Sequence, residues 1–176
     1  MMDTPTNDLT HSRARLYHRL DELEIATTTV AYPAHTTVEE GKRLRGEMVG
    51  TFTKNLLVRD KQRTCFLIVV QEDIVLDLKG LVGIIGAHRS LSFTSAEQMT
   101  TLLGVSPGAL TPMALINNEG SAIRVVIDAS LMDADQVNFH PLVNTESLGI
   151  RPNNLLHFIR STGHEPILVP FTPITS

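Results

Sequence analysis

The sequence predicts an α+β domain built around a mixed, mostly antiparallel sheet. The chain has 176 residues, 42% of them hydrophobic, which suits one domain with a substantial core. Helical and strand-like stretches are interspersed, and some strands are joined by short polar connections of hairpin length. No dinucleotide-binding or phosphate-loop glycine motif occurs, which argues against a doubly wound nucleotide-binding fold. We therefore expect residues 1–176 to form a single domain, with residues 1–8 as a flexible N-terminus.

The first third of the chain predicts a helix, a strand and a second, short helix. Three leucines at helical spacing (Leu16, Leu20 and Leu23) predict a helix over residues 9–25. The β-branched run over residues 27–30 predicts a strand that Pro33 ends. Next, either Thr36 with Glu39 or Thr37 with Glu40 forms a capping box, and the helix that follows should stop near Gly46.

A long hairpin should form the middle of the sheet. Residues 51–58 and 64–70 read as two strands, and the polar residues between them suit a tight connection. Asp77 can cap a following helix that ends at Gly86. A brief strand over residues 91–93 then leads to a helix with a Thr94–Glu97 capping box and a stop at Gly104.

The remaining elements are short. The loop over residues 105–112 carries two prolines and a glycine, and strands are predicted after it over residues 113–117 and 123–128. A helical turn over 128–135 precedes short strands at 136–139 and 147–150. The last helix should begin at Pro152 and end at Gly163, before a closing strand over 167–169.

Lys54 is the residue in this pattern that most needs a reason. At strand periodicity it shares one face with Phe52, Leu56 and Val58, so it is flanked by hydrophobic side chains. A lysine is almost never fully buried unless it is paired. Its ammonium group therefore either reaches water at the edge of the sheet or enters a polar pocket that requires a cation.

Three segments, read in order, carry a resemblance to a known family. They are TKNLLVRDK from Thr53, GALTP from Gly108 and NFHPLVN from Asn138. With them the chain resembles the YbaK/prolyl-tRNA synthetase editing-domain family, and more closely the free-standing ProX or PrdX proteins that deacylate alanyl-tRNA(Pro). The similarity runs from about Tyr32 to Pro170. It implies a mixed sheet curved towards a barrel and surrounded by helices, and no cofactor.

The resemblance also implies site residues. Lys54 is expected to be essential, and the loop at Gly108 should turn backbone N–H groups towards the substrate carbonyl. The implied substrate-binding residues are Asn55, Ala109, Leu110, Pro112, His140 and Asn144. His140 and Asn144 each have a purely structural alternative, as hydrogen-bonded residues of a turn. One departure is that Phe52 and Thr53 stand where alanine-specific relatives are expected to have a histidine.

Charge and cysteine content limit the other possibilities. The net charge is −4, but seven basic residues and two acidic ones between Lys42 and Arg63 give a local balance of +5. On charge alone, an ordinary solvated face is the preferred interpretation. The resemblance implies instead that Lys42, Arg43 and Arg45 contact tRNA. The single cysteine, Cys65, excludes a disulfide framework and is expected to be a packing residue, and the histidines lack metal-ligand spacing. Without a signal region or membrane-spanning run, a cytoplasmic protein is expected.

Three functions remain open at this point. The first is a trans-editing hydrolase for mischarged tRNA(Pro), with alanyl-tRNA(Pro) preferred. The second is the same hydrolase acting on cysteinyl-tRNA or another small aminoacyl-tRNA. The third is a non-catalytic module that binds aminoacyl-tRNA. The expected partners are the acceptor end of tRNA(Pro) and prolyl-tRNA synthetase, and neither DNA nor a membrane.

Overall fold

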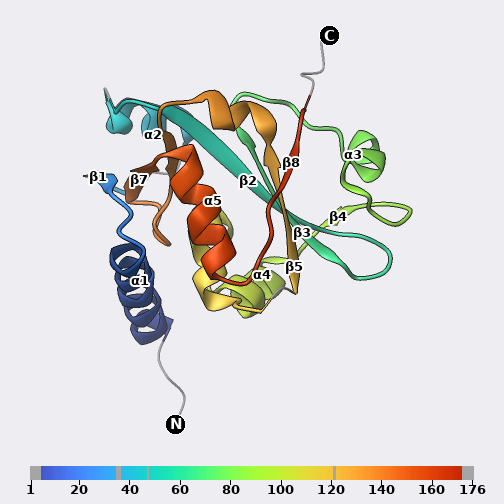
Figure 1. Cartoon of the computed structure of the whole chain (residues 1–176), viewed down its shortest axis with the longest axis horizontal. Coiled ribbons are helices and arrows are strands. Elements are labelled where there is room, and N and C mark those ends of the chain that lie inside the picture. Colours follow the sequence, from blue (N-terminus) through green and yellow to red (C-terminus); the bar gives the residue numbers. More distant parts are fainter. Residues whose placement is uncertain (1–4, 35–36, 47, 121, 172–176) are drawn as a thin grey trace.

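The computed structural model describes residues 5–34, 37–46, 48–120 and 122–171 (Figure 1). The helices are α1 (Pro5–Glu22), α2 (Val38–Arg45), α3 (Leu78–Ile85), α4 (Ala96–Leu103) and α5 (Pro152–Ser161), with 3₁₀ helices η1 (Pro107–Ala109), η2 (Pro112–Asn117) and η3 (Ala129–Asp133). The strands are β1 (Thr27–Ala31), β2 (Thr51–Arg59), β3 (Cys65–Gln71), β4 (Ser92–Phe93), β5 (Ile123–Asp128), β6 (Val137–Phe139), β7 (Glu146–Ile150) and β8 (Ile167–Val169). Of the predicted flexible N-terminus, residues 1–4 lie outside the described residues, and α1 includes residues 5–8.

The strands form one mixed sheet, which confirms the predicted fold class. Its order is β1-β7-β6-β2-β3-β5-β8, and β4 pairs with β2 beside this path. The β2–β3 hairpin is antiparallel, whereas β5 lies parallel to β3. Within the described part of the chain β1 and β8 lie at opposite ends of this order, so the sheet is open rather than a closed barrel.

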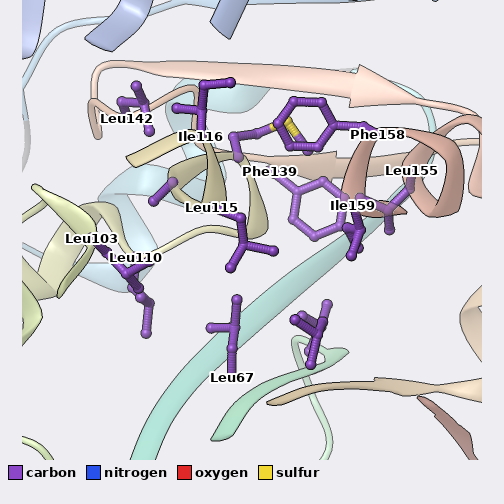
Figure 2. Close-up of a cluster of buried hydrophobic side chains, with 14 of the residues drawn as sticks. Leu67, Leu103, Leu110, Leu115, Ile116, Phe139, Leu142, Leu155, Phe158 and Ile159 are labelled. Carbon is purple, nitrogen blue, oxygen red and sulfur yellow. The ribbon is translucent and has the colours of Figure 1, made fainter. Parts of the chain in front are cut away.

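Two hydrophobic clusters lie on the two faces of the sheet because side chains alternate along each strand. On β3, Leu67 and Val69 belong to the larger cluster, which includes buried residues of α1, α4 and α5. Phe66, Ile68 and Val70 face the other way and pack with α3. Figure 2 shows part of the larger cluster, including Leu110 from the loop that follows η1.

Two sequence predictions are wrong in detail. Residues 113–117 form the 3₁₀ helix η2 and not a strand, because Pro112 occupies its first turn, the Thr111 side chain caps it, and a short buried apolar run fits either structure. The capping box of α4 is formed by Ser95 and Gln98 and not by Thr94 and Glu97. Thr94 instead bonds the Leu57 carbonyl through its N–H (3.1 Å) and hydroxyl (3.2 Å).

The turn of the β2–β3 hairpin is organised by a buried carboxylate. Asp60 is 7% exposed and accepts hydrogen bonds from the N–H groups of Gln62 (2.9 Å), Thr64 (2.9 Å) and His88 (3.0 Å). Burial opposes its ionisation, but these three backbone donors outweigh burial and lower the pKa of Asp60 below its ordinary value. The carboxylate thereby joins the hairpin to the segment that follows α3.

Replacing Asp60 with alanine should lower the melting temperature at neutral pH, because three N–H groups lose a charged acceptor. A carboxyl with a lowered folded-state pKa stabilises the fold above its unfolded pKa, and this stabilisation is lost as the pH falls through the folded pKa. The difference in melting temperature between wild type and variant should therefore shrink in acid. Replacing the exposed Asp133 is the control. A difference that persists at low pH would contradict this assignment.

Candidate active site

A cavity of about 420 Å³ lies where α2, the start of β2 and two loops meet. Its lining residues come from six separate parts of the chain: Tyr32, Thr37, Gly41, Lys42, Arg45, Thr53, Lys54, Glu72, Gly108, His140 and Asn144. The sequence-predicted residues Lys54, Gly108, His140 and Asn144 are thus brought together in space. Lys42 and Arg45 line the same cavity from α2.

Lys54 lies on β2 with its side chain at this cavity. The strand extends over Thr51–Arg59, one residue beyond the predicted 51–58, and Lys54 pairs with Val70 of β3. The side chain is half-buried. Among the described residues no acidic side chain forms an ion pair with Lys54, although other basic residues of this region are paired. The ammonium group is therefore available to an anionic ligand.

Buried residues and a side-chain hydrogen bond hold the loop that carries Gly108 in place. Ala109 and Leu110 are buried, and Pro112 begins η2 inside the core. The Nδ2 group of Asn55 donates a hydrogen bond to the Leu110 carbonyl at 3.1 Å. Asn55, Ala109, Leu110 and Pro112 therefore lie behind the cavity wall and position Gly108, which faces the cavity itself.

Gly108 is not required by the local backbone or by its neighbours. It is not among the glycines with positive φ, and a Cβ atom at this position would meet only Asn144 Nδ2 within 4 Å, at an ordinary 3.7 Å. Because Gly108 lies in the first turn of a 3₁₀ helix, its N–H group has no acceptor within that helix. The missing side chain leaves room in the cavity.

The corner formed by residues 138–144 presents His140 and Asn144. His140 Nδ1 donates a hydrogen bond to the Glu146 carbonyl at 2.9 Å, since a carbonyl oxygen can only accept. In the neutral ring the other nitrogen is then an acceptor. Between them Leu142 is 2% exposed and holds a left-handed backbone with φ 72°. Burial of Leu142 in the core offsets that strain and turns His140 and Asn144 towards one cavity.

The α2 wall of the cavity is held by ion pairs. Two nitrogens of the Arg45 guanidinium contact the two carboxylate oxygens of Glu72 at 3.2 and 3.4 Å, and the guanidinium stacks 3.6 Å from the Phe52 ring centre. Lys42 pairs with Asp73 at 3.5 Å. Arg43 lines no part of the cavity, and its side chain is 77% exposed.

Several lining residues were not predicted from the sequence. Tyr32 is buried and its hydroxyl bonds Ser147 Oγ at 2.8 Å. Burial raises the pKa of the Tyr32 phenol, while the Ser147 hydrogen bond and the charge of Arg45 oppose the increase. Thr53 lies on the face of β2 opposite to Lys54, and its hydroxyl donates a hydrogen bond to the Asn138 carbonyl at 2.8 Å. Thr37, predicted as a helix cap, fulfils that function and also lines the cavity.

A smaller hollow of about 30 Å³ adjoins the cavity and shares Arg45, Thr53 and His140 with it. Its other lining residues are Phe52, Asn55, Asn138, Phe139 and Ser147. Asn55 Oδ1 and Arg45 Nε are buried and have no hydrogen-bond partner among the described residues. The hollow therefore combines a small volume with polar groups.

Other sites receive less support from the structure. A shallow hollow of about 610 Å³ beside the start of α5 contains none of the predicted site residues. Within the described ranges, no three or more histidine, cysteine or acidic side chains gather as metal ligands do. Nor does any described helix combine the length and apolar character needed to cross a membrane.

Comparison with known proteins identifies the class of this domain. The family model described as the aminoacyl-tRNA editing domain matches residues 32–158, which contain all of the residues that line the cavity. The chain therefore belongs to the aminoacyl-tRNA editing domain family. This confirms the family inferred from the three sequence segments.

The individual relatives span most of the chain. The chain is 33% identical over 163 residues to prolyl-tRNA synthetase associated domain-containing protein 1 of Bos taurus, covering 90% of this chain and 95% of the relative. It is 32% identical over 147 residues to prolyl-tRNA editing protein ProX of Acetoanaerobium sticklandii, covering 83% of this chain and 89% of that relative. A solved structure described as a candidate trans-editing enzyme for prolyl tRNA synthetase superposes with a TM-score of 0.68 at 21% identity, covering 92% of this chain and 98% of the solved one. This similarity supports the fold alone.

Proposed function

We propose that this protein is a trans-editing hydrolase that deacylates mischarged tRNA(Pro), with alanyl-tRNA(Pro) as the preferred substrate. The observation that carries the proposal is the half-buried Lys54 at a cavity that also contains Gly108 and His140, with no acidic side chain paired to it in the described part of the chain. Membership of the editing-domain family and the similarity to a ProX protein support the same reaction class.

The bond to be broken is the ester between the amino acid and the terminal ribose. Water attacks the acyl carbon, the bond to the ribose oxygen breaks, and that oxygen takes a proton. The products are the amino acid and intact tRNA. Lys54 would bind the terminal phosphate or ribose region and so position the ester. Its charge would also stabilise the negative oxygen that forms during attack.

Gly108 and His140 would complete the site. The Gly108 N–H is suited to bind the developing oxyanion, because it lies in the first turn of η1. His140 lines the cavity and would contact the ribose or the aminoacyl group there. The Glu146 carbonyl fixes the ring orientation in either case.

The small hollow beside the cavity would act as a sieve. A synthetase pocket shaped for proline cannot strongly exclude alanine, because losing a few methylene contacts costs only about 1–3 kcal/mol. Correction therefore needs a second pocket that rejects proline by size. The hollow is much smaller than the cavity beside it, so it is the proposed place for the methyl group of alanine.

The tRNA itself would first meet the α2 side of the cavity. Lys42, Arg43 and Arg45 remain the proposed contacts there, with Arg43 the most exposed of the three. The proposed substrate, mischarged tRNA(Pro), is produced by prolyl-tRNA synthetase. That synthetase is therefore the proposed protein partner.

Deacylation of a panel of charged tRNAs tests the function. At equal enzyme concentration we expect rapid cleavage of alanyl-tRNA(Pro), slower cleavage of seryl- and cysteinyl-tRNA, and no cleavage of prolyl-tRNA(Pro), because the acyl side chain must enter the small hollow. Initial rates are measured from the loss of labelled amino acid. Rapid cleavage of prolyl-tRNA(Pro) would exclude the sieve. A preference for cysteinyl-tRNA would identify a different small substrate, and binding without cleavage would identify a non-catalytic module.

A further inference from the structure

A cluster of basic side chains lies at the far end of the β2–β3 hairpin from the cavity. Its members, here called the hairpin patch, are Arg59, Lys61, Arg63 and Arg89. Arg59 ends β2, and the next two lie in the turn that Asp60 organises. The N–H of Lys61 bonds the His88 carbonyl at 3.2 Å, which places Arg89 beside the turn. In Figure 1, β2 crosses the molecule from α2 to this turn.

The hairpin patch has little acidic compensation. Among the described residues none of its members forms an ion pair with an acidic side chain, whereas Arg13, Arg19, Lys42, Arg43, Arg45 and Arg160 all do. Asp60 lies within the patch, but its carboxylate is buried and bound to three backbone N–H groups. Glu97 lines a hollow together with Arg59 and Arg63 but forms no ion pair with either in the described part of the chain.

Two of these arginines occupy backbone positions that do not favour arginine. Arg63 has φ 69° and Arg89 has φ 66°, in the left-handed region where glycine and asparagine are favoured. Both side chains are exposed. Local backbone geometry therefore does not account for arginine at either position.

We propose that the hairpin patch binds phosphates of the tRNA stem, while the 3′ end occupies the cavity; this inference rests on the proposed function. A tRNA is far larger than a cavity of about 420 Å³, so most of the substrate must lie outside it. Lys54 and Arg59 are five residues apart on β2, or roughly 17 Å along the strand, and their side chains point to opposite faces of the sheet. The other members of the patch lie at the turn beyond the end of β2, which a stem leaving the cavity would reach by following the strand. Arginine forks match phosphate geometry, and their charge is permanent.

Other features of this region fit an RNA ligand. Phe93 is 63% exposed and pairs with Val58 of β2, on the face of the sheet opposite to the Arg59 side chain. An aromatic ring is therefore available on that face to a ribose or an unpaired base. On α1, Arg13 pairs with Glu146 and Arg19 with Glu119, and Arg15 donates a hydrogen bond to Asn117. On α2, Lys42 and Arg45 each have an acidic partner, so the hairpin patch adds phosphate contacts to those proposed at the cavity.

The test removes two charges where the backbone should tolerate it. In the double variant Arg63→Asn/Arg89→Asn, asparagine accepts the left-handed backbone, so the melting temperature should stay the same or rise. The matched control, Arg151→Gln/Arg160→Gln, removes the same charge from exposed positions on α5 and just before it. Binding of uncharged tRNA(Pro) is measured by fluorescence anisotropy at several salt concentrations.

We expect the double variant to flatten the slope of log Kd against log salt by roughly two units, and the control to leave it unchanged. A second measurement compares alanyl-tRNA(Pro) with an alanylated CCA-end oligonucleotide too short to reach the hairpin. The ratio of the two kcat/KM values should fall about ten-fold in the double variant at low salt.

An unchanged salt slope in the folded double variant would overturn the proposal, and would also be the result if the patch served an acidic protein partner. An equal loss on both substrates would overturn it as well, since the short oligonucleotide cannot contact the hairpin. If the wild-type protein cleaves neither substrate, the hydrolase function fails, and the binding measurement still decides whether the patch holds RNA.

Discussion

Replacing Lys54 with methionine should reduce deacylation of alanyl-tRNA(Pro) by roughly 10²- to 10³-fold while the protein stays folded, a loss of the size seen when one electrostatic contact to a transition state is removed. Methionine keeps most of the aliphatic stem but carries no charge. Lys54 is half-buried at the cavity and has no acidic partner in the described structure, so its charge is available to the substrate and not needed by a neighbour. Melting temperature and single-turnover rate are the measurements.

The exposed Lys79 on α3 provides the matched control. Lys79→Met makes the same substitution and removes the same charge, but Lys79 does not line the cavity. We expect that control to cleave at the wild-type rate. Lys54→Arg separates two explanations: partial activity would indicate that the charge suffices, and no activity would indicate that the ammonium must sit at one position. A folded Lys54→Met variant with the wild-type rate would remove Lys54 from the site.

Strong local signals made much of the fold predictable. The strand at Lys54, its antiparallel partner, and the helices that end at Gly86 and Gly104 follow from hydrophobic periodicity, caps and left-handed glycines. The strand predicted over residues 113–117 was wrong because local signals are weak there. Residues 113–116 are apolar and all buried, so no exposed position marks the period, and only the surrounding core decides between strand and helix.

The candidate site was predictable only in part, for a related reason. Lys54 is conspicuous because it interrupts an apolar face, and the segments at Gly108 and His140 carry a family pattern. Glu72 and Tyr32 neither interrupt an apolar face nor belong to one of the three family segments. Glu72 follows a core strand, and only the placement of α2 above the sheet brings Arg45 to it. The basic count around Lys42 likewise did not reveal which cations would be paired, since pairing depends on tertiary contacts.

Gly108→Ala should lower kcat/KM for alanyl-tRNA(Pro) on the order of 10²-fold, as expected when the reacting groups are displaced by about 1 Å. The methyl group would project towards Asn144, whose Nδ2 lies 3.7 Å from the position that a Cβ atom would take, and would occupy space beside the proposed oxyanion site. The fold should not suffer, because φ at Gly108 is not in the left-handed region. A Gly→Ala change at such a position stabilises a protein by about 0.4–1 kcal/mol through the unfolded chain.

Gly83→Ala is the control that separates the cavity from the general effect of adding a methyl group. Gly83 lies on α3, a Cβ atom there would meet nothing within 4 Å, and its backbone is helical. Both variants should therefore melt at or above the wild-type temperature, but only Gly108→Ala should lose activity. Equal activity of Gly108→Ala and wild type would mean that the space left by this glycine is not used by the substrate.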